Sequence, residues 1–225
     1  DGFMKGEACG GSVLACGAPM HARAMYRGRA VKQDGRSASL TAPNGQAQQR
    51  LIEEALRVGR LSADQVCAIE AHGTGTALGD PTEVGSLTEA LLKHRSAEPA
   101  ALCLGSVKAN IGHAEPAAGM MGLLTLLLRV ASGRVAPNAQ LRVLNQHVES
   151  TLRTARCALA LHVAPCGGIR TPGPQAGGVN SFGYSGTIAH ALKRQSQQTV
   201  QPSRCHHCAL DTGGGLSNGR EERHL

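Results

Sequence analysis

One stretch of the sequence decides the fold: Gly105-Ser106-Val107-Lys108-Ala109-Asn110-Ile111-Gly112-His113-Ala114-Glu115-Pro116-Ala117-Ala118-Gly119. The apolar run from Ala101 to Val107 leads into it and is typical of a buried strand. Met120 to Ala131 follows it and is apolar on nearly every face, which predicts a buried helix. Lys108 and His113 are therefore expected on a loop between a strand and a helix, where open α/β sheets place their chemistry.

A second loop of the same kind lies upstream. Val66 to Glu70 has the composition of a buried strand, and the glycine-rich stretch from Ala71 to Pro81 follows it. Glycine allows sharp turns and a close approach of the backbone to a ligand. His72 is placed directly after the strand. The two loops are thus expected at the ends of two strands of one sheet.

The helices between these strands can also be predicted from the sequence. We expect Asp80 to cap a helix, Pro81 to occupy its first position and Glu83 to complete a capping box. Apolar residues recur at helical spacing in Gln46 to Arg57 and again in Thr82 to His94. Helices that alternate with strands indicate an α/β fold with parallel strands.

Three more strands are expected nearer the ends of the chain. They are Ser12 to Leu14, Leu159 to Val163, and Ile188 to Lys193, the last as an antiparallel or edge strand. Pro165 to Gly178 is rich in Gly and Pro and is expected to form a surface loop. From Gln195 onward the chain loses apolar periodicity, which predicts a disordered tail.

Composition excludes several classes of function. The net charge of +7 comes from scattered basic residues without aromatic interleaving, which does not favour nucleic-acid binding. The longest apolar run is too short to span a bilayer. The 8 cysteines lack the spacing of a disulfide framework, so we expect reduced thiols, with Cys67 and Cys103 buried in strands.

Three stretches carry a resemblance to β-ketoacyl synthases. Glu70 to Thr76, with Gly79-Asp80-Pro81, resembles their first histidine motif. Lys108 to His113 resembles their lysine-and-second-histidine motif, and Gly178 to Thr187 resembles their glycine-rich closing loop. Two further stretches are similar to ketosynthase domains of type I polyketide synthases: Val31 to Arg36 and Leu40 to Gly45. The chain is therefore identified as the C-terminal portion of such a domain.

The resemblance implies an α/β fold of the thiolase-like type, a layered sandwich of two βαβαβ halves. In this chain the second half would be complete and the first half mostly missing. The expected division is residues 1–30 as the end of the N-terminal half, 31–194 as the C-terminal half and 195–225 as the disordered tail.

The implied reaction is a decarboxylative Claisen condensation of an acyl thioester with a malonyl-carrier protein. The resemblance makes His72 and His113 the donors whose Nε–H groups stabilise the enolate. It makes Lys108 their electrostatic support, with Glu115 as its partner. The backbone N–H of Phe182 would complete an oxyanion hole, and its ring would gate the acyl pocket.

The resemblance also implies the partners of the site. Thr74 and Thr76 would bind the phosphopantetheine arm of an acyl carrier protein, although turn chemistry accounts for them equally well. The domain would bind no cofactor and no metal, and would act in the cytoplasm or an organelle such as a plastid. It would form a homodimer, with other synthase domains as possible neighbours and without nucleic acid or membrane span.

The nucleophile of the family is a cysteine at a helix N-terminus, which is expected upstream of Asp1, so this chain alone would lack it. Other interpretations stay open at this point. The chain could come from a fatty acid synthase ketosynthase, or be a truncated, non-catalytic module that dimerises or binds carrier protein. Cys205 and Cys208 could also form half of a zinc site, although a complete site needs four ligands.

Overall fold

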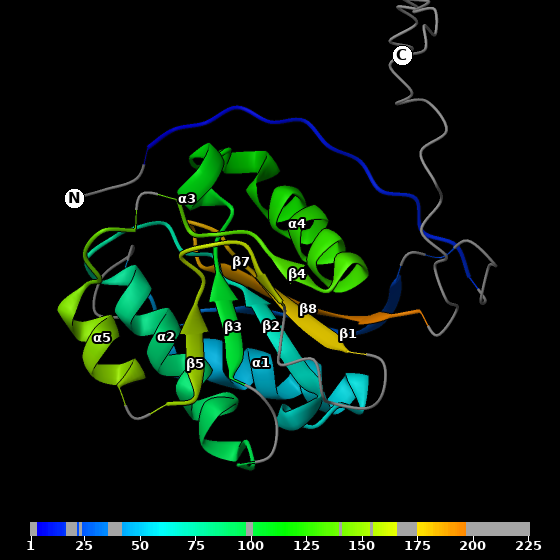
Figure 1. Ribbon diagram of the computed structural model, residues 1–225, viewed down its shortest axis with the longest axis horizontal. Coiled ribbons are helices and arrows are strands. Elements are labelled where there is room, and N and C mark those ends of the chain that lie inside the picture. The colour runs from blue at the N-terminus through cyan, green and yellow to red at the C-terminus, as the bar shows by residue number, and fades with distance from the viewer. Residues whose placement is uncertain are drawn as a thin grey trace, which may run out of the picture.

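A single six-stranded sheet organises the part of the chain that can be described (Figure 1). The structure is a computed structural model, and it describes residues 4–16, 22, 24–35, 42–97, 101–139, 141–153, 155–165 and 175–196. The predicted tail from residue 195 lies outside these residues, apart from its first two positions. The helices are α1 Gly45–Gly59, α2 Gly79–Ala90, α3 Lys108–Ile111, α4 Ala118–Ser132 and α5 Gln146–Leu152. The strands are β1 Ala24–Gln33, β2 Val66–Glu70, β3 Leu102–Gly105, β4 Arg134–Val135, β5 Cys157–Leu159, β6 Ala164–Pro165, β7 Ala176–Phe182 and β8 Thr187–Gln195.

The sheet has the strand order β1-β8-β7-β2-β3-β5. β2 pairs in parallel with both β3 and β7, and β3 pairs in parallel with β5. β8 runs antiparallel to β7 on one side and to β1 on the other. The antiparallel prediction for residues 188–193 is confirmed, although β1 and not β8 is the edge strand. Strands β4 and β6 form a separate two-stranded sheet.

The long helices begin and end close to where the sequence predicts. The Asn44 side chain caps α1 by accepting a hydrogen bond from the Ala47 backbone N–H, and the left-handed residue Arg60 ends the helix. A short 3-10 turn, η3 Glu115–Ala117, leads into α4, with Pro116 in its first positions. The predicted helix over residues 82–94 is instead α2 followed by a second 3-10 turn, η2 Leu92–His94.

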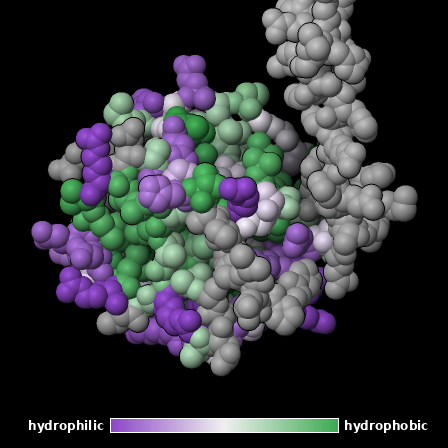
Figure 2. All heavy atoms as spheres, viewed as in Figure 1, coloured by the Kyte–Doolittle hydropathy of each residue, from purple (hydrophilic) through white to green (hydrophobic). Residues whose placement is uncertain are grey.

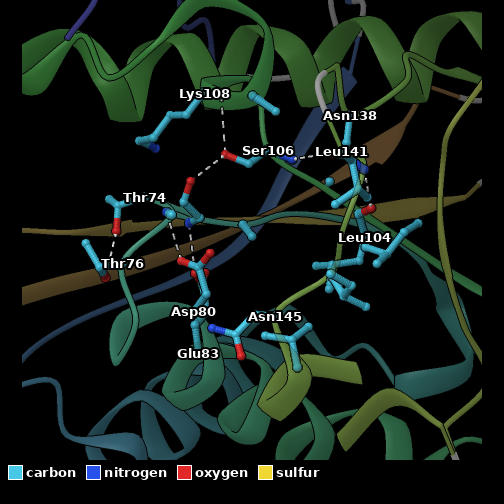
Figure 3. Close-up of a pocket in the computed structure, with 18 of the residues that line it drawn as sticks. Thr74, Thr76, Asp80, Glu83, Leu104, Ser106, Lys108, Asn138, Leu141 and Asn145 are labelled. Atoms are coloured by element: carbon cyan, nitrogen blue, oxygen red, sulfur yellow. Dashed lines mark hydrogen bonds between the residues drawn. The ribbon is translucent and has the colours of Figure 1, made fainter. Parts of the chain in front are cut away.

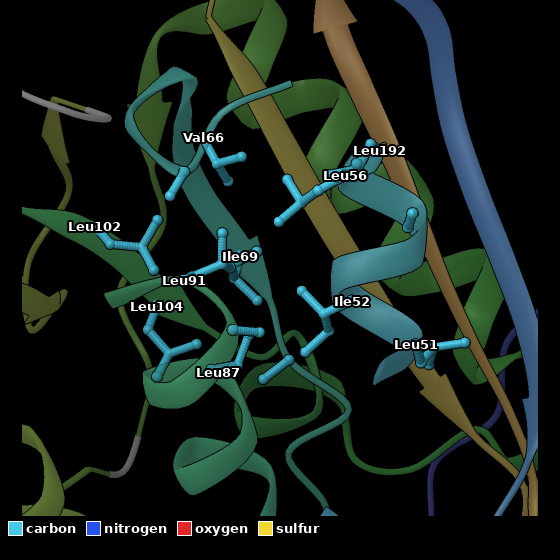
Figure 4. Close-up of a cluster of buried hydrophobic side chains, with 14 of the residues drawn as sticks. Leu51, Ile52, Leu56, Val66, Ile69, Leu87, Leu91, Leu102, Leu104 and Leu192 are labelled. Atoms are coloured by element: carbon cyan, nitrogen blue, oxygen red, sulfur yellow. The ribbon is translucent and has the colours of Figure 1, made fainter. Parts of the chain in front are cut away.

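The larger hydrophobic core lies between the sheet and the helices α1 and α2 (Figure 4). Leu51, Ile52 and Leu56 project from α1 toward Ile69 of β2 and Leu192 of β8, and all are buried. A smaller cluster covers the opposite face, where α4 packs against β2 and β7. Both faces of the central strands are thus covered, as the near-continuous apolar runs predict. The predicted burial of Cys67 and Cys103 is confirmed.

The surface is not uniformly polar. On the face shown in Figure 2, hydrophobic residues gather over the left and centre, and charged residues lie mostly toward the rim. Several large apolar side chains are well exposed, among them Leu128 at 69% and Val143 at 87%. Within the residues that the structure describes, no helix combines the length and apolar character needed to cross a bilayer.

Three local expectations are wrong. Residues 12–14 form no strand, because the backbone pairing of the described segment 4–16 is confined to Met4, Lys5 and Gly6 beside His113. The strand expected over 159–163 lies two residues earlier, as β5, where it reaches its partner β3. The predicted surface loop over 165–178 gives way to β7 at Ala176, and residues 166–174 lie outside the described part.

The proposed boundary between residues 30 and 31 falls inside β1. All of β1 pairs with β8, so residues 24–30 belong to the same sheet as the rest of the described chain. The division of the chain into two ketosynthase halves stays a prediction.

Candidate active site

The two loops singled out by the sequence meet at one edge of the sheet. β2 and β3 are parallel neighbours, so their carboxyl ends carry His72 and Lys108 to the same place. Gly73 makes the close approach possible: its φ is +45°, and a Cβ there would lie 2.7 Å from the Ser106 Cβ. Between these loops, α2 and α5 lies a cavity of about 760 Å³ (Figure 3). Its polar wall includes Thr74, Thr76, Asp80, Glu83, Ser106, Lys108, His113 and Asn138.

The His72 ring lies beside this cavity and is held at one nitrogen. The backbone N–H of Phe182 donates to His72 Nδ1 at 3.3 Å, so the ring proton belongs on Nε2. Burial lowers the pKa of His72 to about 3, with the charges of Lys108 and His113 acting in the same direction. His72 is therefore a neutral imidazole with an Nε2–H donor.

His113 repeats this arrangement on the second loop. The backbone N–H of Glu115 donates to His113 Nδ1 at 2.9 Å, which again leaves the proton on Nε2. Burial and the nearby Lys108 lower the pKa of His113. The two imidazole rings are perpendicular, with centroids 5.7 Å apart. The structure thus brings together two neutral N–H donors from different loops.

Lys108 is the first residue of the short helix α3, and not a loop residue as expected. Burial lowers the pKa of its ammonium group, while the carboxylates of Glu83, Glu70 and Asp80 raise it. The expected partner Glu115 instead forms an ion pair with Lys5 at 3.2 Å. The negative charge that supports Lys108 therefore comes from three other carboxylates.

Glu83 is the most important site residue that sequence reasoning missed. Its Oε1 accepts hydrogen bonds from the His72 N–H at 2.7 Å and from Asn180 Nδ2 at 2.7 Å, and its Oε2 accepts one from the Gly73 N–H at 2.9 Å. Burial raises the pKa of this carboxyl, and the three donors lower it. The capping-box prediction is wrong, because α2 begins at Gly79 and Asp80 accepts from the Gly75 N–H.

A second buried carboxylate holds the Lys108 loop. Glu70 Oε1 accepts from the Val107 N–H at 2.5 Å, and its Oε2 lies 2.6 Å from Arg129 Nη1 of α4. Oε2 and Nη1 form no aligned hydrogen bond within the described residues, so the contact is an ion pair of charges alone. Burial consequently outweighs Arg129 and raises the pKa of Glu70 to about 7.

The remaining predicted residues lie around the same two loops. Thr74 and Thr76 line the cavity with their hydroxyl oxygens 3.3 Å apart, and Thr76 Oγ1 also accepts from the Gly79 N–H, as turn chemistry predicts. The Phe182 ring lies 5.4 Å from the His72 ring, and its N–H faces His72 Nδ1 instead of an open oxyanion hole.

Possible metal ligands do not gather around this site. In the part of the chain that the structure describes, His, Cys, Asp and Glu side chains form no group of three or more that could hold a metal ion. Cys205 and Cys208 lie outside the described residues.

A paired-histidine site at the edge of an α/β sheet is what condensing enzymes of one family share with this chain. Residues 23–142 match the family described as "Beta-ketoacyl synthase, C-terminal domain". The match covers more than half of the sequence, so the chain belongs to the β-ketoacyl synthase C-terminal domain family.

Its relatives among curated proteins are polyketide synthases. The chain is 42% identical over 175 residues to the spectinabilin polyketide synthase system protein NorA' of Streptomyces orinoci, covering 78% of this chain and 5% of that protein. It is 38% identical over 200 residues to the 6-methylsalicylic acid synthase of Aspergillus niger, covering 85% of this chain and 11% of that protein. The chain thus spans a small part of the length of these relatives.

Solved structures of similar proteins agree with this assignment. The oxazolomycin ketosynthase domain OzmH KS7 of Streptomyces albus JA3453 superposes with a TM-score of 0.72 at 34% sequence identity. The superposition covers 80% of this chain and 31% of that one. A ketosynthase from module 6 of the bacillaene synthase of Bacillus subtilis 168 gives a TM-score of 0.72 at 29% identity, with 79% and 31% coverage. The predicted thiolase-like α/β fold is confirmed.

Proposed function

We propose that this chain supplies the decarboxylation half of a ketosynthase active site in polyketide biosynthesis. The observation that carries the proposal is the matched state of His72 and His113, each with Nδ1 occupied by a backbone N–H donor. Both rings can therefore donate from Nε2, and both stay neutral near pH 7 because their pKa values are lowered. Two neutral donors aimed at one oxygen suit the stabilisation of an enolate.

The proposed reaction balances as follows. The bond between the malonyl carboxylate and its neighbouring carbon breaks and releases carbon dioxide, and its electron pair forms the thioester enolate. The enolate carbon then attacks the carbonyl carbon of an acyl group held on a cysteine thiol. A tetrahedral oxyanion forms and collapses, and the cysteine leaves as the thiolate. His72 and His113 donate hydrogen bonds to the enolate oxygen in the first step.

Other groups have supporting roles in this proposal. Lys108 holds positive charge beside the two histidines, which favours their neutral form and the negative enolate. Thr74 and Thr76, at the cavity wall, would contact the phosphopantetheine arm of an acyl carrier protein. Phe182 would act by holding His72, since its N–H already has an acceptor. The nucleophilic cysteine would come from outside this chain.

The assembly around the site is also a proposal. The relatives are much longer than this chain, which supports neighbouring synthase domains as partners. Exposed apolar side chains such as Leu128 and Val143 are suited to burial against such domains or in a homodimer. The chemistry requires no cofactor bound by this domain, because the carrier protein brings the substrate.

The test separates the two half-reactions in the full-length synthase. His113→Ala should reduce carbon dioxide release from the malonyl carrier on the order of 10²–10³-fold, or about 3–4 kcal/mol, because one preorganised donor is lost. Loading of a radiolabelled acyl group onto the cysteine should fall far less. His94→Ala, on an exposed turn, serves as the matched control and should change neither. Equal losses of loading and decarboxylation would make His113 a general base or a structural residue.

A further inference from the structure

A continuous series of buried polar groups connects the far side of the sheet to the His72 loop. His190 of β8 and Asn180 of β7 are register partners, and they are 1% and 2% exposed. His190 Nδ1 lies 2.5 Å from Asn180 Oδ1, and Asn180 Nδ2 donates to Glu83 Oε1 at 2.7 Å. Glu83 in turn accepts from the His72 N–H, so the series reaches the His72 loop through this carboxylate.

The hydrogen bonds of this series have one consistent direction. Asn180 presents an oxygen to His190 and its NH₂ group to the Glu83 carboxylate, so the proton of His190 must lie on Nδ1. With the amide reversed, an oxygen would face the carboxylate and one of its three donors would be lost. The orientation of a single amide therefore decides whether Glu83 is fully hydrogen-bonded.

His190 is built to keep that direction. Its ring packs over Gly178, where a Cβ would lie 2.6 Å from His190 Cε1 and 2.8 Å from Nε2. Nε2 has no hydrogen-bond partner within the described residues, so a second ring proton there would be a buried, unsatisfied donor. The site therefore admits neutral His190 with its only proton on Nδ1.

We propose that His190 is a positioning residue for His72, acting through the amide of Asn180 and the carboxylate of Glu83. The backbone of His72 and Gly73 is held by Glu83, and Glu83 is held by an amide whose orientation His190 fixes. His72 is thereby fixed at both ends, because β7 also supplies the Phe182 N–H to its ring. The catalytic consequence rests on the proposed function, whereas the positioning itself does not.

Hydrogen–deuterium exchange of backbone amides in this chain tests the positioning without any activity. In His190→Leu, which removes the donor, the amide protons of His72 and Gly73 should exchange about tenfold faster, because their acceptor loses a partner. His190→Asn places an NH₂ group near the position of Nδ1 and should keep exchange within about twofold of the wild type. Leu192→Val is the matched control on β8, since Leu192 is equally buried and apolar.

The outcomes are distinct. Faster exchange confined to His72 and Gly73 in His190→Leu, with recovery in His190→Asn, supports the proposal. Unchanged exchange at these two amides, or the same acceleration in Leu192→Val, overturns it. If His190→Leu does not fold, Asn180→Ala should give the same local acceleration with His190 in place. Because exchange is measured on the free chain, a failure of the proposed condensation chemistry would leave this result unaffected.

Discussion

Replacing Glu70 by glutamine should make the chain's stability less dependent on pH between about 4.5 and 7. Glu70 is buried, and its ion pair with Arg129 only partly offsets the loss of hydration, so its pKa is raised to about 7. A raised pKa means that the folded chain holds this proton more tightly than the unfolded chain does. The carbonyl of the introduced glutamine could still accept from the Val107 N–H, so the substitution changes the charge and keeps the hydrogen bond.

The magnitude follows from the pKa. An ordinary glutamate titrates near 4.5 and Glu70 at about 7, so ionised Glu70 costs the folded chain about 3 kcal/mol. Below pH 4.5 the group is protonated in both states, and this cost is absent. As the pH rises toward 7 the unfolded chain loses the proton first, so the cost grows, and above about 7 it is fully present.

Urea unfolding of the wild type and Glu70→Gln over this pH range provides the measurement. The free energy of unfolding of the wild type, relative to that of the variant, should fall by about 3 kcal/mol as the pH rises. Glu53→Gln, on the exposed face of α1, removes the same charge and should give a nearly constant difference. The reasoning is refuted if the Glu70 difference is flat, or if it grows with pH, which would mean that Arg129 outweighs burial.

Two further predictions concern packing and thiol reactivity. Gly28→Ala would place a Cβ 2.5 Å from a backbone oxygen of α1 and should cost about 2 kcal/mol or more, whereas Gly85→Ala meets open space in α2 and should stabilise by about 0.5–1 kcal/mol; thermal unfolding shifts of the same sign would contradict this. Iodoacetamide should modify the exposed Cys9 and Cys16 in the folded chain, whereas Cys157, whose pKa burial raises to about 12, should react only in urea; equal rates at neutral pH would contradict its burial.

Much of the sheet could be predicted because its strands are short apolar runs with clear ends. β2 has the predicted bounds, and His72 and His113 lie together because both follow the carboxyl ends of parallel strands. Periodicity and punctuation are local properties, and they sufficed for these elements. The strand expected at residues 12–14 failed because a strand also needs a neighbour, which no local pattern reveals.

The supporting residues could not be predicted because their partners are distant in sequence. Glu83 satisfies the pattern of a capping box, yet its carboxylate turns to the loop before its helix and to Asn180, 97 positions away. Arg129 lies in a helix otherwise predicted as wholly apolar, and only the fold brings it to Glu70. A charged residue within an apolar run was the one available signal, since such a residue is rarely buried without a partner.

The edge of the sheet sets the order in which this chain can fold during its synthesis. β1 spans residues 24–33, but its strand partner within the described residues is β8 at residues 187–195, so about 150 residues must be translated between them. At ribosomal rates of roughly 5–20 residues per second, β1 waits on the order of ten to thirty seconds for that partner. During this interval the apolar face of α1 lacks the strand β8 against which it packs. The nascent chain is therefore most exposed to aggregation and most dependent on chaperones before β8 emerges, because its longest-range pairing can form only last.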